Sequence, residues 1–179
     1  LDVNELLPAL EDMGATGAAD EIIKLPGATY KLLVLSGLGE TSVNYSAETL
    51  RRSAGAAARS LAGAKSATFA LPHSSKSELA AIAEGALLGA YAFDEFRGTS
   101  KSERKAVLAA VTIFAKSANS AESKAAIKRA SIIATNTHIV RDLINTPPSH
   151  LTPESFCARF KKIGLAAGLK DEIFTDARL

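Results

Sequence analysis

The sequence has a single cysteine, no long apolar run and almost no excess of charge of either sign. Because Cys157 has no second cysteine with which to form an intrachain disulfide, the chain is typical of a reducing compartment, and we expect a buried structural thiol. No apolar run approaches the ~20 residues that cross a bilayer as a helix. Lys and Arg number 21 against 19 for Asp and Glu, and a net charge of +2 is too small to indicate nucleic acid binding. We therefore expect neither membrane nor nucleic acid partners.

A leader segment is also lacking, and what is present is the composition of a globular protein. The chain begins Leu1-Asp2, without methionine or a basic segment, so we expect no signal peptide and a chain trimmed at this end. Hydrophobic residues make up 47% and charged residues 22% of the chain, which excludes a disordered protein. Its 179 residues can form one good core, or one domain with the beginning of another.

Three apolar runs predict β-strands, at residues 30–36, 67–71 and 106–114. Each run is almost continuously hydrophobic, as is typical of a strand covered on both faces. Turn signals bound the first of them, with Pro26-Gly27 before it and Gly37-Leu38-Gly39 after it. A further short strand is expected at 172–175.

Segments of helical period alternate with these runs and predict an α/β domain. Ser75 and Glu78 form a capping box at the start of one helix. The helix that starts near Ser120 is over twenty residues long, which suits a connector between domains. Strands alternating with helices of this size indicate a largely parallel sheet flanked by helices. The first expected helix ends near Gly14, and the last runs from Thr152 to near Gly168. Between them we expect helices at 47–61, 75–96 and 120–143.

The segment 141–154, RDLINTPPSHLTPE, reads as a junction close to the C-terminus. The prolines after Thr146 end the long helix, because proline lacks an N–H and disfavours helical geometry in the residue before it. Thr152 is a good N-cap and Pro153 suits the first helical position, so a new helix begins at once. A junction of this kind leads into a further unit, although only 25 residues follow Glu154.

The Gly37-Leu38-Gly39 loop follows a strand, as a phosphate-binding loop would. The dinucleotide fingerprint needs a third glycine three residues on, where this chain has Ser42. No Gly-Lys-Ser/Thr sequence indicates a nucleoside triphosphate site either. A plain strand-end turn is the favoured interpretation, and a relic ligand-binding loop is the alternative.

The histidines His73, His138 and His150 share no metal-ligand spacing with Cys157 or with a carboxylate pair. His138 lies four residues before Asp142 on the long helix, which favours a local structural pair over a metal site. The serines that follow His73 do not resemble a nucleophile elbow.

Two charge clusters are interpreted as solvated surface. Asp94 and Glu95 are adjacent and point to different helix faces, so they make a poor acid–base couple. Lys124, Lys128 and Arg129 place basic charge along one side of the long helix, where a solvated face is favoured over an anionic partner. We therefore expect no catalytic, cofactor-binding or metal-ligating residue in this chain.

Two segments resemble the leucyl (cytosol) aminopeptidase family of metallopeptidases. Residues 84–96, EGALLGAYAFDEF, are similar to a helix of that family, and residues 134–153 are similar to its interdomain segment. The second segment carries Arg141-Asp142-Leu143, Asn145-Thr146-Pro147-Pro148 and Leu151-Thr152-Pro153. The spacing between the two segments also matches, and the resemblance covers residues 11–179.

The resemblance implies a macro-domain-like N-terminal domain joined by a connector helix to a peptidase domain. We accordingly expect an α/β domain at 1–119, the connector at 120–144 and the truncated beginning of the peptidase domain at 145–179. Family members are cytoplasmic homohexamers that remove N-terminal residues from peptides, leucine by preference, with two divalent ions, manganese or zinc. The same location, homo-oligomer, peptide substrate and ions are expected for the parent protein.

The family's metal ligands are not matched in this chain. They are a lysine, aspartates and a glutamate, the last within Asn-Thr-Asp-Ala-Glu-Gly-Arg, and residues 175–178 lack that glutamate and glycine. We therefore assign no metal ligation to Asp176 and expect no metal in this chain. The chain alone is expected to be inactive. Its expected role in the parent protein is assembly and access to the peptidase site. The region after Pro148 is expected to be mobile or docked onto another copy, because Phe156, Phe160, Ile173 and Phe174 would be short of partners. The rival interpretation is a free-standing macro-like module that holds a nucleotide or nucleic acid through the Gly37–Gly39 loop or the basic helix side.

Overall fold

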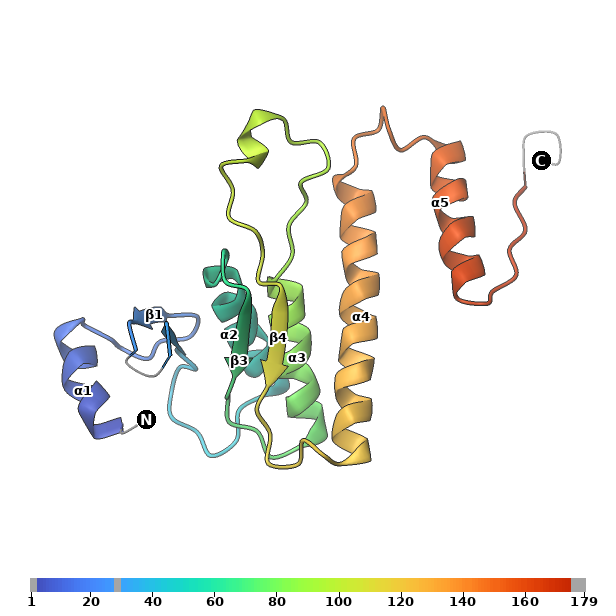
Figure 1. Cartoon of the computed structure of the whole chain (residues 1–179). Coiled ribbons are helices and arrows are strands. Elements are labelled where there is room, and N and C mark those ends of the chain that lie inside the picture. Colours follow the sequence, from blue (N-terminus) through green and yellow to red (C-terminus); the bar gives the residue numbers. More distant parts are fainter. Residues whose placement is uncertain (1–2, 28–29, 175–179) are drawn as a thin grey trace. The chain divides into compact units, whose positions relative to one another are not determined.

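The computed structural model describes residues 3–27 and 30–174, which form helices and short strands (Figure 1). It divides into two compact units, Leu1–His138 and Ile139–Leu179. None of the helices in the described residues is long and apolar enough to span a membrane. The elements in chain order are α1 (Val3–Asp12), β1 (Ile22–Leu25), β2 (Leu33–Ser36), α2 (Ala47–Ser60), β3 (Ser66–Phe69), α3 (Lys76–Gly89), the short 3-10 helix η1 (Thr99–Lys101), β4 (Ala110–Ile113), α4 (Ala121–Asn145) and α5 (Pro153–Ala166).

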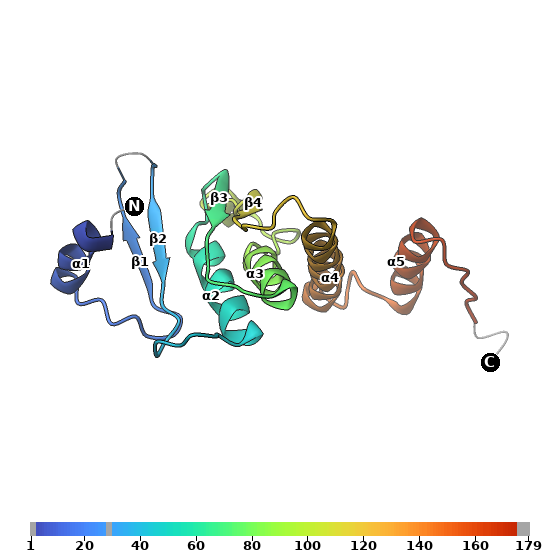
Figure 2. The ribbon, with the colours of Figure 1, turned by 90° about the horizontal axis from the view of Figure 1, so that it is seen from below.

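The α/β class is confirmed, but the strands form two small sheets instead of one largely parallel sheet. Strands β1 and β2 pair antiparallel, with Ile22 opposite Ser36 (Figure 2). Strands β3 and β4 pair parallel, with Ser66 opposite Ala110 (Figure 1). A short connection joins neighbouring strands antiparallel, whereas a parallel pair needs a crossover, here through α3. The sequence pattern missed β1 because its four residues include a lysine and form no long apolar run. The macro-like resemblance stays a prediction.

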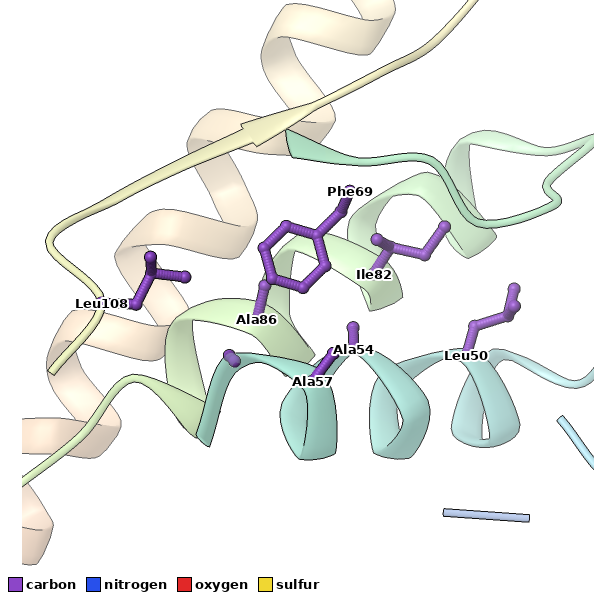
Figure 3. Packing of buried hydrophobic residues seen from close by; sticks show 8 residues of the cluster. Leu50, Ala54, Ala57, Phe69, Ile82, Ala86 and Leu108 are labelled. Atoms are coloured by element: carbon purple, nitrogen blue, oxygen red, sulfur yellow. The ribbon is translucent and has the colours of Figure 1, made fainter. Parts of the chain in front are cut away.

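The core of the first unit lies between α2, α3 and the β3–β4 sheet (Figure 3). Alanines on the facing sides of α2 and α3 let the two helices approach closely, and Phe69 from β3 covers them. Leu108, just before β4, closes one end of the cluster. The buried cluster consists of Leu50, Ala54, Ala57, Ala58, Phe69, Ile82, Ala86 and Leu108.

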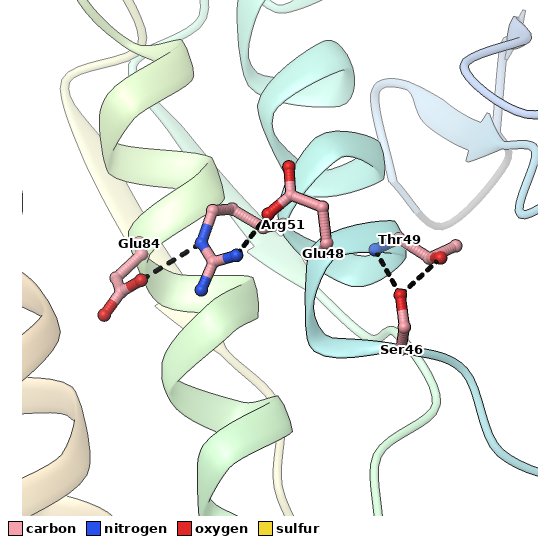
Figure 4. A network of polar contacts seen from close by, with 5 residues as sticks. All are labelled: Ser46, Glu48, Thr49, Arg51 and Glu84. Atoms are coloured by element: carbon pink, nitrogen blue, oxygen red, sulfur yellow. Dashed lines mark hydrogen bonds and ion pairs between the residues drawn. The ribbon is translucent and has the colours of Figure 1, made fainter.

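A polar network also ties α2 to α3 (Figure 4). The Arg51 Nε lies 3.1 Å from the Glu84 Oε2, and the same guanidinium pairs with Glu48 one turn earlier on α2. Burial lowers the pKa of Arg51, but its hydrogen bonds to Glu48 and Glu84 outweigh burial and raise that pKa above its ordinary value. Ser46 caps α2 by accepting a hydrogen bond from the Thr49 N–H at 3.0 Å. The predicted start of this helix is thereby confirmed.

Helix α3 begins as predicted but ends at Gly89, well before the expected Phe96. After this point Asp94 turns back to pair with Arg104 at 2.9 Å and with Arg97 at 3.4 Å. The interpretation of Asp94 and Glu95 as a solvated helix end is therefore wrong, because Asp94 closes a loop through ion pairs. Residue-level helix propensity does not report such contacts, since Arg104 is ten positions away in the sequence.

The described part of the second unit contains the end of α4, the junction and α5. The Thr146 hydroxyl donates to the Asp142 carbonyl at 2.7 Å, where α4 ends. Thr152 accepts from the Ser155 N–H at 3.3 Å and Pro153 opens α5, so both predicted helix boundaries at the junction are confirmed. Residues 172–174 form no strand, contrary to expectation, and Thr175 lies outside the described residues. The division at residues 119 and 144 stays a prediction.

Candidate functional site

A polar cleft of about 290 Å³ lies where both strands of the parallel sheet end. Ligands of open α/β sheets bind in crevices outside the carboxyl ends of the strands. Here the segment after β3 leads into α3, and the segment after β4 leads into α4. The lining residues from these two segments are His73, Ser74, Ser75, Lys76, Leu79, Ser117, Ser120, Glu122 and Ser123.

Three serine hydroxyls on the α4 side form a chain of hydrogen bonds. The Ser123 Oγ, only 3% exposed as a residue, lies 2.9 Å from the Ser117 Oγ and accepts from the Ser120 Oγ at 3.0 Å. Ser120 also accepts from the Ser123 N–H at 3.1 Å, which caps the first turn of α4. Because a hydroxyl oxygen has two lone pairs, Ser117 and Ser120 retain capacity to accept a hydrogen bond.

His73 is held in one tautomer on the α3 side. Its Nδ1 lies 2.9 Å from the Leu71 carbonyl oxygen, which can only accept, so this nitrogen carries the hydrogen. The Nε2 of a neutral His73 then presents a lone pair. Hydrogen bonding to the backbone thus orients the ring. The sequence, a histidine followed by two serines, did not indicate this contact.

Three backbone N–H groups around the start of α3 already have acceptors. Glu78 accepts from the N–H groups of Ser74 at 2.6 Å and Ser75 at 3.2 Å, and Ser75 in turn accepts from the Glu78 N–H. The predicted capping box is therefore present. The N–H group of Ser74 is the main cause that lowers the pKa of Glu78 below its usual 4.5. A bound anion would have to compete with this carboxylate.

Opposite charges face the cleft from its two sides. Lys76 stands at the first position of α3 and Glu122 in the first turn of α4. The N–H of Glu122 itself, then the charge of Lys76 and the hydroxyl of Ser120, lower the pKa of Glu122. Within the part of the chain that the structure describes, Lys76 and Glu122 do not approach within the 4.0 Å of an ion pair. The charge of Lys76 therefore acts on Glu122 without a direct ion pair.

We expect Glu78→Gln to lower thermal stability at neutral pH and to leave it unchanged in acid. The pKa of Glu78 is depressed in the folded state, so its stabilisation is present above the unfolded value of 4.5 and is lost as the pH falls through the lower folded value. Glutamine keeps the cap acceptor but cannot titrate. Unfolding midpoints of both proteins between about pH 7 and pH 3 test this. The control is Glu103→Gln in an exposed loop, and an equal loss at every pH would contradict the assignment.

The Gly37–Gly39 loop is a strand-end turn packed on its own chain. The N–H of Gly37 donates to the Glu21 carbonyl at 2.8 Å, and the N–H of Gly39 donates to Gly17 at 3.0 Å. A Cβ at position 37 would lie 1.9 Å from the Ala18 carbonyl oxygen, so only glycine fits there. Amides engaged in this way do not cradle a phosphate, which supports the favoured interpretation of this loop.

The remaining candidates are not among the residues that line the cleft. His138 packs its ring 5.0 Å from that of Tyr91, and His150 is exposed beside Ser149. Cys157 is half-buried on α5, so the expectation of a buried thiol is not met. The basic residues of α4, namely Lys124, Lys128 and Arg129, are exposed as a solvated face requires.

Sequence reasoning set aside the residues at 73–75 and missed the other lining residues. Lys76 and Glu122 are 46 positions apart (122 minus 76), and no motif connects them. One usable signal was present, because both residues lie just beyond predicted parallel strands, whose carboxyl ends share one edge.

No group of three or more His, Cys, Asp or Glu side chains converges as a metal site in residues 3–27 and 30–174. Asp176 lies outside the described residues.

Comparison with known proteins yields one family. The model of the N-terminal domain of the cytosol aminopeptidase family matches residues 2–100. A probable cytosol aminopeptidase of Streptomyces avermitilis is 41% identical over 98% of this chain and 36% of its own length. The corresponding protein of Streptomyces coelicolor is 38% identical over 97% of this chain and 37% of its own length. The chain spans about a third of the length of the curated relatives it matches.

Solved structures show the same fold. The bottromycin maturation enzyme BotP in complex with Mn has a TM-score of 0.79 and 26% identity, over 95% of this chain and 36% of its own. A mutant of tomato leucine aminopeptidase has a TM-score of 0.78 and 24% identity, over 93% of this chain and 34% of its own. The likeness to the tomato enzyme concerns the fold alone.

Proposed function

We propose, because this chain belongs to the cytosol aminopeptidase family, that it forms the N-terminal part of a peptidase that removes N-terminal amino acids, leucine by preference, from peptides. The observation that carries the proposal is the match of the family's N-terminal domain to residues 2–100. Support comes from relatives that align over nearly the whole chain, including the junction segment. The parent protein would act in the cytoplasm.

The proposal includes two divalent ions, manganese or zinc, for the parent protein. A structural relative in complex with Mn supports a divalent ion. The described residues of this chain do not fit such a site, because no three potential ligands converge. We therefore assign no step of the metal chemistry to this chain, and place the ions in the part of the relatives that it does not cover.

The role proposed for this chain is assembly, within a homohexamer, and access to the peptidase site. Helix α5 buries none of its residues, which supports a packing partner for this unit. The rings of Phe156 and Phe160 lie 4.7 Å apart, yet the two residues are 40% and 53% exposed. Exposed aromatic surface of this kind is typical of an interaction site.

A chimeric enzyme tests the proposed function. This chain would replace the matching third of the Streptomyces avermitilis relative, and the chimera would be assayed on leucine p-nitroanilide with Mn²⁺. We expect chelator-sensitive turnover within about tenfold of the parent enzyme, a barrier change of ~1.4 kcal/mol. The relative without its N-terminal third is the control and is expected to lose both activity and assembly.

The 179-residue chain assayed alone is expected to give no metal-dependent turnover. Activity of the chain alone that a chelator abolishes would contradict the absence of a site. A folded but inactive chimera, with the parent enzyme active, would contradict the proposed function.

A further inference from the structure

We propose that the cleft at the carboxyl ends of β3 and β4 binds a free α-amino acid, with its carboxylate toward Lys76, its ammonium group toward Glu122 and an aliphatic side chain against Leu79. This inference goes beyond the proposed function and does not rest on it. The binding would be a property of the first unit alone, because every lining residue belongs to Leu1–His138.

The separation of the two charges selects a zwitterion. Lys76 and Glu122 line one cleft, interact electrostatically and yet are not within ion-pair distance. A ligand with a single charge is attracted by one of these groups and repelled by the other. A molecule that carries an ammonium group and a carboxylate on one carbon atom can lie between them and satisfy both.

The occupied helix caps argue against a simple anion. The N–H groups of Ser74 and Ser75 are bound by the Glu78 carboxylate, and Ser120 caps α4 internally. With Glu78 and Glu122 close by, the two helix dipoles are already offset by negative charge. A phosphate or sulfate would therefore gain little binding energy from the N–H groups or the dipoles of these helices.

The size and lining of the cleft fit a small molecule with one apolar end. Its volume of about 290 Å³ is at the lower end of the range for small-ligand sites. Leu79 is a buried apolar wall, and the hydroxyl oxygens of Ser117 and Ser120 supply neutral acceptors. Lys76 and Glu122 are exposed to solvent, so screening by water keeps the affinity low.

Titration of the ¹⁵N-labelled chain with L-leucine, followed by amide chemical shifts, tests the proposal. We expect shifts in residues 73–79 and 117–123, with a dissociation constant of about 1 to 10 mM. L-leucine amide lacks the carboxylate and 4-methylpentanoate lacks the ammonium group. Each is expected to bind about fivefold more weakly than leucine, the factor that one exposed ion pair contributes.

Two variants and a matched control locate the site. Lys76→Gln and Glu122→Gln are each expected to weaken leucine binding about fivefold, while Lys116→Gln, outside the cleft, leaves it unchanged. Thermal unfolding of each variant checks that the fold is retained. No shift with leucine, shifts in other segments, or an analogue that binds as tightly as leucine would overturn the proposal. The analogue series on the unmodified chain decides it even if a variant fails to fold.

Discussion

Replacing Phe69 with alanine is expected to destabilise the first unit by about 3 to 5 kcal/mol. Phe69 is only 6% exposed and fills the space between the β3–β4 sheet and the alanines of α2 and α3. The neighbouring positions Ala54, Ala57 and Ala86 have no longer side chain that could move into the cavity. The loss therefore includes both the transfer of the ring to water and the cavity left behind, out of a total stability of about 5 to 15 kcal/mol.

Urea unfolding followed by circular dichroism measures this loss, and Phe114→Ala is the matched control. Phe114 follows β4, its N–H donates to the Phe69 carbonyl at 2.9 Å, and its side chain is 63% exposed. Its replacement is expected to change stability by about 0.5 kcal/mol or less. Equal effects of the two substitutions would contradict the position of the core between the sheet and the helices.

Replacing Gly85 with alanine is expected to destabilise the same unit by about 2 kcal/mol or more. A Cβ at this position would lie 2.0 Å from the Arg51 carbonyl oxygen across the α2–α3 contact. The obstructing atom is backbone, so no side-chain rotation relieves the clash and the helices must separate. The gain of about 1 kcal/mol in helix propensity is smaller than the cost of moving two packed helices.

Gly164→Ala on α5 is the control for this prediction. A Cβ there meets only the Leu169 Cβ, at an ordinary 3.9 Å. Helix propensity should then dominate and raise the stability of α5 by roughly 0.5 to 1 kcal/mol. A stabilising or neutral Gly85→Ala in the same urea titration would show that α2 and α3 do not pack as closely as described.

The helix boundaries that local chemistry controls were readable from the sequence. Ser75 and Thr152 cap helices in the structure as predicted, because a cap involves groups only two or three residues apart. Helix α2 begins at residue 47 as expected, and Ser46 is its cap. The prolines after Thr146 end α4 for the same reason. The family resemblance in residues 84–96 and 134–153 was also visible at this level. The family model covers the first of these segments, and the relatives align over nearly the whole chain.

The end of α3 and the pairing of the strands were not readable in this way. Asp94 leaves the helical pattern to pair with Arg104, and β2 pairs with β1 where the run 30–36 had suggested a strand of a parallel sheet. A run of apolar residues indicates that a strand is buried. It does not say which strand lies beside it or in which direction.

The sequence alone was sufficient for the α/β class, the junction helix starts and the family, since these depend on neighbouring residues and on motifs. The tertiary structure was needed for the two separate sheets, for the close contact at Gly85 and for the cleft. Lys76 and Glu122 line one cleft because the crossover through α3 brings the carboxyl ends of β3 and β4 to one edge. Contacts of that kind depend on how distant segments pack, and a linear pattern of residues does not contain that information.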